Sequence, residues 1–222
     1  MYTCVEFERT ARRGPSKGAN VTTREGGYAS GRLRRKQIVT AATELFARVG
    51  YRHATILELA QAAGISRTGL LHHFGSKQAL LEAVLERRDA EDAVSIPDAL
   101  TDQSGLAALA ALVRLAERNA TRRNLVALFA VLSAEAAAVD HPAHDYFVQR
   151  YRQAVGGIEG SLCRARRAGL LAPWADPARQ ARVIVALMDG LQVQWLLTPT
   201  EVDMAGAVRE HLQGLLVVPL PD

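Results

Sequence analysis

The stretch that most constrains the fold is residues 55–77, TILELAQAAGISRTGLLHHFGSK, because its pattern predicts two short helices that meet at a tight turn. Thr55 is a natural N-cap for the first helix, and Ser66 is one for the second. Gly64 stands between them, where the end of a helix favours positive φ. This arrangement predicts a helix-turn-helix, whose second helix lies in the major groove of DNA. An ordinary helical hairpin inside an all-α domain is the alternative.

An amphipathic helix is predicted before this stretch, from Gly31 to a stop at Gly50. Its apolar face consists of Ile38, Ala41, Ala42, Leu45, Phe46 and Val49. Its first turns contain four cations, namely Arg32, Arg34, Arg35 and Lys36. The positive end of a helix disfavours cations, so nearby phosphate groups would explain their placement. A further helix over residues 76–93, capped by Ser76, leads away from the helix-turn-helix.

The charge of the chain is concentrated near its beginning. Residues 1–36 contain nine cations and three acids, a net charge of +6, which leaves −2 for the rest of a chain with net charge +4. This asymmetry indicates a polyanionic partner bound at one end; a solvated basic tail without a partner is the alternative. Residues 1–30 are rich in Gly, Arg, Ser and Thr and are predicted to be a disordered arm. The arm either adds phosphate or minor-groove contacts or has no role.

Composition excludes several other classes of protein. No apolar run approaches the roughly 20 residues that span a bilayer, and no apolar secretory segment is present, so we expect a cytoplasmic protein without a membrane partner. The two cysteines, Cys4 and Cys163, are far apart and lack metal-ligand spacing, which excludes a disulfide framework. Few stretches alternate with period two, so the predicted fold class is all-α.

The remainder of the chain, residues 79–222, is predicted to form a helical bundle that follows a DNA-binding unit at 31–78. A connection is expected between about 95 and 104, around Pro97. Helical patterns then follow at 106–119, 125–138, 141–169, 177–197 and beyond Pro199.

Residues 32–85 resemble the DNA-binding domain of the TetR family of bacterial transcriptional regulators. The resemblance rests on ATILELAQAAGISRTGLLHHFGSKQALLEAVL after a basic helix, and its most specific part is HHFGSKQALL. It implies an all-helical homodimer, usually a repressor. In such a protein a helical effector-binding and dimerisation domain follows the DNA-binding helices, which we call the reader (residues 31–78). It implies no enzymatic activity and no cofactor; the expected partners are operator DNA, a second copy of the chain and a small-molecule effector.

The same resemblance implies roles for residues of the reader. Arg67 is the leading base contact, because a guanidinium can bond O6 and N7 of guanine together; a phosphate contact alone is the alternative. Thr55 and Lys77 match phosphate-anchoring positions at the starts of two helices. His72 and His73 are divided between one backbone contact and one packed ring. The full predicted DNA-binding set is Thr55, Ser66, Arg67, Thr68, Gly69, His72, His73 and Lys77.

One position departs from the family pattern. Many members have Tyr where this chain has Leu71, and that hydroxyl typically contacts a phosphate. Leucine cannot make this bond, so either a nearby arginine or His73 replaces it, or operator affinity is lower.

The helix at 177–197 is apolar on every side from Val183 to Leu197, apart from four residues near its middle, and must therefore be covered on every side. Gly190 would let a second helix approach closely. The resemblance implies a dimer built as a four-helix bundle from the last two helices of each subunit; packing within a monomer is the alternative. The predicted interface residues are Val183, Leu187, Gly190, Gln194, Leu197, Val208, Leu212 and Leu215.

Polar groups stranded on otherwise buried helices are the candidate effector pocket, with apolar neighbours as lining. The predicted pocket residues are Phe129, Ser133, Tyr146, Met188, Asp189, Gln192 and Trp195. For each of them, structural packing is the alternative. Asp189 either satisfies a donor in the core or favours a ligand with a hydroxyl or cationic donor.

The sequence HPAHD places His141, His144 and Asp145 close together, but no further His or Cys lies at matching spacing, so no metal site is predicted. The predicted function is a ligand-responsive transcriptional repressor that binds a palindromic operator as a homodimer and is released by a small molecule. A sequence-neutral, architectural DNA-binding protein without a ligand is the alternative. A helical enzyme is disfavoured, because the chain has no Ser/His/Asp spacing, nucleotide loop or HExxH motif.

Overall fold

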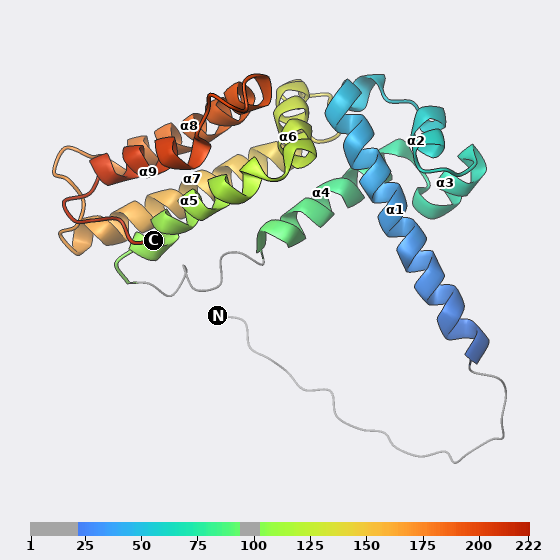
Figure 1. Ribbon diagram of the computed structural model, residues 1–222, viewed down its shortest axis with the longest axis horizontal. Helices are drawn as coiled ribbons and strands as arrows, with labels where there is room; N and C mark the ends of the chain where they lie inside the picture. The colour runs from blue at the N-terminus through green and yellow to red at the C-terminus, as the bar shows by residue number, and fades with distance from the viewer. Residues whose placement is uncertain (1–21, 94–102) are drawn as a thin grey trace, which may run out of the picture. The chain divides into compact units, whose positions relative to one another are not determined.

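A computed structural model of the chain describes residues 22–93 and 103–222, with side chains described for 30–90 and 103–222. These residues form α-helices and contain no strand beyond an isolated bridge between Leu171 and Leu216, which confirms the all-α prediction. The helices are α1 Thr22–His53, α2 Ile56–Ala62, α3 Arg67–Phe74, α4 Lys77–Ala93, α5 Leu106–Ala120, α6 Arg123–Glu135, α7 His144–Arg167, α8 Pro177–Leu197 and α9 Met204–Gly214 (Figure 1).

Helix α1 is longer than its sequence predicts. It begins at Thr22, so residues 22–30 are helical where a disordered arm was expected, and residues 1–21 of that arm lie outside the described residues. At its other end the backbone leaves helical geometry at Gly50, which has φ 77°, at the predicted stop. The contacts described below all lie within residues 35–222, which form one compact unit.

One apolar cluster holds the reader helices together. Ile38 and Phe46 of α1, Leu59 of α2 and Leu70 of α3 are fully buried in it, as the spacing of apolar residues predicts. Truncating a buried leucine of this kind to alanine costs about 2–5 kcal/mol, so the cluster fixes where α3 lies.

The same cluster continues into the second half of the chain. Leu128 and Leu132 of α6, Phe147 of α7 and Leu81 of α4 are buried in the cluster that also contains the residues of α1, α2 and α3. The apolar core therefore does not stop at residue 78, where the sequence placed the boundary of the DNA-binding domain.

A second apolar cluster forms the body of the C-terminal half. It contains buried residues of α5, α7, α8 and α9, among them Leu109, Leu162, Ile184 and Leu212. Helix α5 packs on α9, and α7 packs on α8. Among the described residues, no helix is long and apolar enough to cross a membrane.

Candidate DNA-binding surface and regulatory domain

The start of the helix-turn-helix is fixed by a reciprocal cap. The Glu58 N–H donates to Thr55 Oγ1 at 3.2 Å, and the Thr55 N–H donates to Glu58 Oε2 at 2.9 Å. This is a capping box, which satisfies two N–H groups that the first turn of a helix leaves unpaired. Hydrogen bonds from the side chain and the backbone of Thr55 hold the pKa of Glu58 below its usual value.

The turn and the second cap orient α3. Gly64 adopts φ 64°, which a side chain would strain, and the Ile65 N–H donates to Ala60 O at 3.0 Å. Ser66 Oγ accepts from the Gly69 N–H at 3.0 Å and so caps α3. Both predicted N-caps, Thr55 and Ser66, are thus present.

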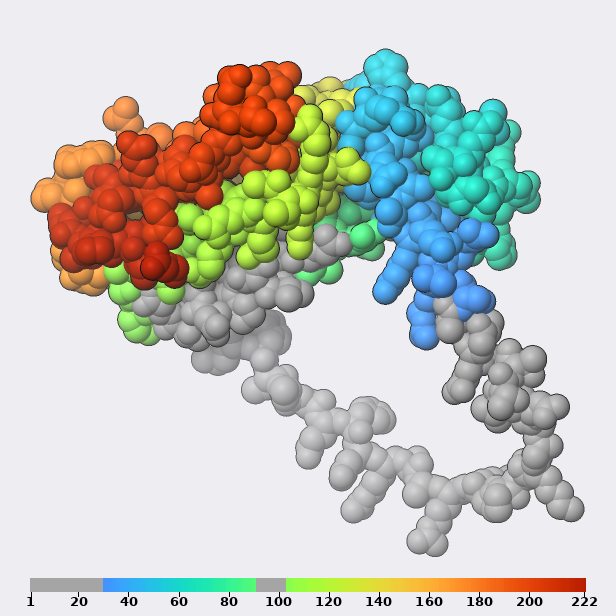
Figure 2. All heavy atoms as spheres, in the orientation of Figure 1, coloured from blue at the N-terminus to red at the C-terminus, as the bar shows by residue number. Residues whose placement is uncertain are grey.

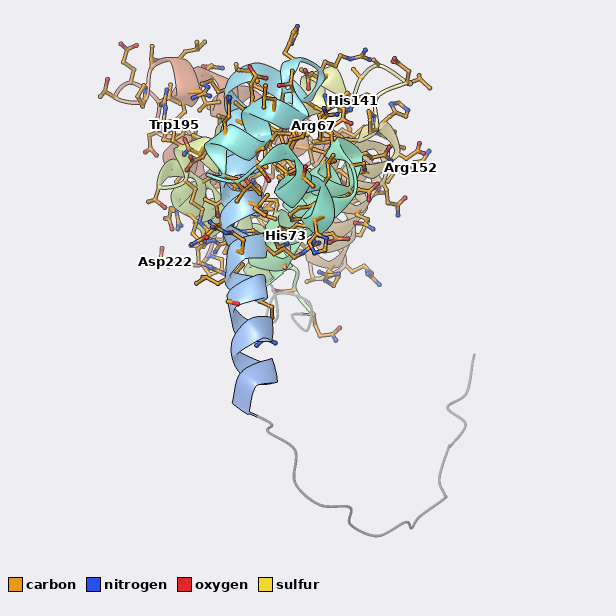
Figure 3. The ribbon with its side chains drawn as sticks, turned by 90° about the vertical axis from the view of Figure 1, so that its right-hand side faces the viewer. Arg67, His73, His141, Arg152, Trp195 and Asp222 are labelled. Carbon is orange, nitrogen blue, oxygen red and sulfur yellow. The ribbon has the colours of Figure 1, made fainter. Side chains whose placement is uncertain are left out.

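Helix α3 buries one side and exposes the other. Leu70 and Phe74 are buried, whereas Arg67, Thr68 and His72 are exposed. Figure 3 looks onto this helix, from which the labelled Arg67 and His73 project. The first turn of α3 therefore presents a guanidinium and a hydroxyl to solvent.

An arginine of α1, Arg35, contacts the C-terminal end of α3. Arg35 Nη1 donates to His73 O at 3.2 Å, and its guanidinium carbon lies 4.2 Å from the centre of the Phe74 ring. The sequence associated the cations of α1 with phosphates, whereas this one contacts the reading helix. His73 is half-buried, and its backbone carbonyl makes the contact.

Lys77 uses its side chain inside the protein. Its Nζ donates to Tyr51 O and to Ala54 O, both at 2.8 Å, and lies 4.2 Å from the centre of the Tyr51 ring. Burial lowers the pKa of this ammonium, and the charge of Glu135 opposes the shift. The ammonium therefore bonds the end of α1 and the residue that follows it, whereas the sequence assigned Lys77 to a phosphate.

The carboxylate of Glu135, at the end of α6, binds the last turn of α1, after the kink at Gly50. Glu135 Oε2 accepts from the Tyr51 N–H at 2.7 Å, and Oε1 accepts from the Arg52 N–H at 3.3 Å. Any side chain at Gly50 would collide with this carboxylate. Sequence reasoning missed this contact, and the one signal for it was a lone acid at the end of an otherwise apolar helix.

His141 and Asp140 complete this junction. The side chain of His141 is fully buried, with Nε2 3.6 Å from Glu135 Oε2 and Nδ1 accepting from the Ala143 N–H. Burial lowers the pKa of His141, and Glu135 opposes that shift. Arg52 pairs with Asp140 at 2.8 Å at the exposed edge.

The histidines of HPAHD make internal contacts. His141 faces Glu135, and His144 Nδ1 donates to Ala136 O at 2.8 Å. Among the described residues, no group of three or more His, Cys, Asp or Glu is arranged to hold a metal ion.

The predicted pocket residues fall into separate places. Phe129 and Tyr146 lie near α4, where the guanidinium carbons of Arg88 and Arg150 are 4.1 and 4.8 Å from the centre of the Phe129 ring. Asp89 Oδ1 accepts from Tyr146 Oη at 2.8 Å and from Arg150 Nη1 at 2.7 Å. Burial strongly raises the pKa of Tyr146. This group joins the end of α4 to α7.

A second group joins α7 to α8. Tyr151 Oη donates to Asp189 Oδ2 at 2.8 Å, while Ser133 Oγ donates to Ala130 O. Burial raises the pKa of Tyr151 to about 12 and also raises the pKa of Asp189. Asp189 therefore accepts a hydrogen bond from a hydroxyl group of its own chain. The sequence offered this internal contact as the alternative to a ligand contact.

The remaining pocket residues, Met188, Gln192 and Trp195, lie on α8 and line or border other parts of the structure. Met188 and Gln192 line a cavity of about 10 Å³, the space of a single water molecule. Trp195 is buried in the second apolar cluster, 5.7 Å from the guanidinium of Arg123. The structure therefore does not gather the seven predicted residues around one open cavity.

The predicted interface residues divide between two helices. Val183 and Leu197 of α8 are exposed, and Leu187, Gly190 and Gln194 are exposed or half-exposed on the same helix. Val193, which the prediction did not include, is 48% exposed.

The other predicted interface residues, two in α9 and one directly after it, are buried within their own chain. Val208, Leu212 and Leu215 are each 1% exposed, because the apolar face of α9 packs on α5 and α8 of the same chain. Their side chains are therefore not available to a partner, and α9 offers polar residues such as Glu210 and Gln213 instead.

Two family models together match most of the described chain. Residues 38–84 match "Bacterial regulatory proteins, tetR family", and residues 105–217 match "BetI-type transcriptional repressor, C-terminal". The transcriptional regulator BetI 2 of Chromohalobacter salexigens is 31% identical over 181 residues, which are 79% of this chain and 83% of the relative. The chain belongs to the tetR family of bacterial regulatory proteins. It is a transcriptional regulator, and its C-terminal half is of the repressor type.

Other relatives of this tetR-family chain are also regulators. TtgR of Pseudomonas putida is 28% identical over 195 residues, which are 79% of this chain and 86% of the relative. SmeT of Stenotrophomonas maltophilia in complex with triclosan has a TM-score of 0.70 at 22% identity, covering 86% of this chain and 98% of SmeT. A regulator from Saccharomonospora viridis in complex with choline has a TM-score of 0.69 at 22% identity, covering 83% and 97%. These structures share the tetR-family fold.

Proposed function

We propose that this tetR-family repressor binds a palindromic operator as a homodimer and leaves it when a small molecule binds its C-terminal helices. The observation that carries the proposal is the first turn of α3, where Arg67 and Thr68 are exposed. The opposite side of the helix is locked by buried Leu70 and Phe74. A rigid helix with a polar, exposed first turn is what reading of the major groove requires.

Each residue of the predicted DNA-binding set has a specific part in this proposal. Arg67 reads a base edge, and Thr68 and Gly69 lie beside it at the groove. The helix starts at Thr55, Ser66 and Lys77 direct backbone N–H groups to phosphates. The side chains of His72 and His73 add contacts further along α3.

The proposed domains are an arm at 1–30, the DNA-binding domain at 31–78 and the effector and dimerisation domain at 79–222. The dimer forms through the outward side of α8, which exposes Val183, Val193 and Leu197. The two readers then enter successive major grooves about 34–36 Å apart, so the operator is palindromic. Since the regulator acts on DNA, we place it in the cytoplasm.

The proposed route of release runs through α4. Asp89 joins this helix to Tyr146 and Arg150 of α7, and Arg150 also stacks on Phe129. A ligand with an apolar or aromatic body that displaces Arg150 from the Phe129 ring also removes a bond that holds α4. Such a ligand shifts the reader only by as much as it prefers the displaced arrangement.

Ligands of different chemistry bind other proteins of this fold, so we do not restrict the effector to one chemical class. Triclosan and choline are bound by other members of the fold. In this chain two guanidinium groups already lie over the Phe129 ring, so a quaternary ammonium would have to compete with internal cations.

A gel-shift competition tests the proposal. The DNA segment upstream of the chain's own coding region should bind at concentrations where random DNA of equal length does not compete. Arg67→Ala should lose this preference while dimerisation is retained. Arg67→Lys keeps the charge but replaces the planar fork of arginine by a single ammonium, so it should retain general DNA affinity and lose part of the discrimination, which is about 1–3 kcal/mol for a good base contact.

Arg179→Ala is the matched control, because Arg179 is exposed at the start of α8, away from the reader. Its preference should equal that of the unchanged protein. If random DNA competes as well as the upstream segment, the chain is the sequence-neutral binder and the operator proposal is wrong. If Arg67→Ala discriminates normally, Arg67 contacts phosphate and does not read a base.

A further inference from the structure

An open cleft of about 510 Å³ lies where α1 and α4 meet the turn between α5 and α6. Its size is within the range of small-molecule sites. Figure 2 shows the side on which this turn lies beside α1. The lining residues are Thr40, Thr43, Glu44, Val84, Arg87, Arg88, Thr121, Arg122, Arg123, Asn124 and Leu125. This cleft shares no residue with the predicted effector pocket or with the predicted DNA-binding set.

The chemistry of the lining is that of an anion site. The lining contains four arginines and one acid, Glu44, so the lining residues have a net formal charge of +3. The hydroxyls of Thr40, Thr43 and Thr121 donate to backbone carbonyls, so the donors that face a ligand come from the arginines and Asn124. The apolar members are Val84 and Leu125. A cation would meet this charge unfavourably, and a wholly apolar ligand would cover donors without pairing them.

The first turn of α6 adds to the positive potential. Residues 122–125 line the cleft, and α6 begins at Arg123 without a side-chain cap. The N–H groups at a helix start have no partner within the helix and favour an anion. Here this helix start borders a cavity already lined by arginines, so both features select the same charge.

The arginines are held in place by their surroundings. Arg87 Nη1 donates to Thr40 Oγ1 at 2.6 Å, which links α4 to α1. Arg88 is 4% exposed and stacks on Phe129. Arg123 Nη2 donates to Leu196 O at 2.7 Å. A guanidinium has five N–H donors in a rigid fork, so positioned arginines bind carboxylates and phosphates with little loss of side-chain freedom.

We propose that this cleft binds a small organic anion, a carboxylate or a phosphate ester, with the arginines of α4 and of the α5–α6 turn as its main contacts. The bound anion joins helices α1 and α4 to the first turn of α6. By holding α1 and α4, the bound anion stabilises one position of the reader and so changes operator affinity. This effect on DNA binding rests on the proposed function. Binding of the anion itself does not depend on the operator proposal.

Isothermal titration of the full-length, DNA-free protein at low ionic strength tests this. The probes are citrate and inorganic pyrophosphate, with choline chloride as the cationic comparison. We expect citrate or pyrophosphate to bind and choline not to bind at this cleft. Arg122→Gln should weaken binding about tenfold through the loss of one charged hydrogen bond. Glu44→Gln should strengthen binding about threefold, because it removes the acid that repels the anion.

Arg179→Gln is the control for total charge, since it removes the same charge from an exposed position outside the lining. Thermal unfolding of the unliganded variants verifies that each is folded, and Arg87→Gln provides a second variant should Arg122→Gln unfold. The proposal is overturned if neither anion binds, or if Arg179→Gln weakens binding as much as Arg122→Gln. Gel shifts of the unliganded variants report on the operator proposal separately.

Discussion

Replacing Glu135 by glutamine should destabilise the protein measurably, because this carboxylate accepts two backbone N–H groups at once. Its partners are the N–H groups of Tyr51 and Arg52, at 2.7 and 3.3 Å. Glutamine offers one carbonyl oxygen, so one bond is lost and the other no longer has a charged acceptor. The Glu135 side chain is 17% exposed, so solvent screens these bonds little.

The expected magnitude follows from the strength of charged hydrogen bonds. Losing one costs about 1.5–3 kcal/mol, so we expect the free energy of unfolding of Glu135→Gln to fall by about 2 kcal/mol. In a chain of this length that is a fall in Tm of roughly 4–8 °C. Glu135→Ala should cost more, about 3 kcal/mol, because both N–H groups then lose their acceptor.

Thermal unfolding followed by circular dichroism measures the effect, and amide hydrogen exchange localises it. The amides of Tyr51 and Arg52 should exchange faster in Glu135→Gln. Glu117→Gln is the control, since Glu117 is exposed on α5, and its Tm should change little. A Tm of Glu135→Gln equal to that of Glu117→Gln, with unchanged exchange at both amides, would refute the reasoning.

Three further predictions concern other contacts. Since burial lowers the pKa of His141, the unfolded chain binds a proton there that the folded chain does not. The free energy of unfolding should therefore be full above about pH 6.5 and fall toward pH 5. Over the same pH range, the Tm of His141→Gln should fall less than that of the unchanged protein. Val193→Glu should give a monomer by light scattering, whereas Val217→Glu, which is 57% exposed and lies outside α8, should remain dimeric. Asp89→Asn should lower the free energy of unfolding by about 0.5–1 kcal/mol, since its partly exposed pair with Arg150 is screened, and should weaken operator binding without effector; unchanged gel shifts would exclude a role for this contact in placing α4.

The helices of the reader were predictable because their signals are local. Thr55 and Ser66 act within three residues of themselves, and Gly64 and Gly50 mark backbone positions with positive φ. Apolar spacing also predicted the burial of Leu70, because a period of 3.6 decides which side of a helix faces the core.

The contacts that sequence could not provide join residues far apart in the chain. The ammonium of Lys77 donates to Tyr51 O and Ala54 O at the end of α1, and Glu135 accepts from the Tyr51 N–H although it is 84 residues away in the chain. The spacing of apolar residues in α9 correctly predicted that one side of this helix is buried. The spacing does not indicate whether that side is covered by the same chain or by a partner. The packing of Val208 on the body of the same chain decides that point.

The apolar cluster shared by α1–α4, α6 and α7 has a consequence for cooperativity. Because Leu128 and Leu132 belong to the same buried cluster as Phe46 and Leu70, we expect local opening of the DNA-binding helices to loosen the packing of α6 and α7 as well. Regions that open together exchange their amide hydrogens with a common protection, so the helix-turn-helix and α6 should form one foldon. An isolated fragment ending at residue 78 would expose the reader's half of that cluster to water. The proposed DNA-binding domain thus depends for its order on helices that lie outside it in the sequence.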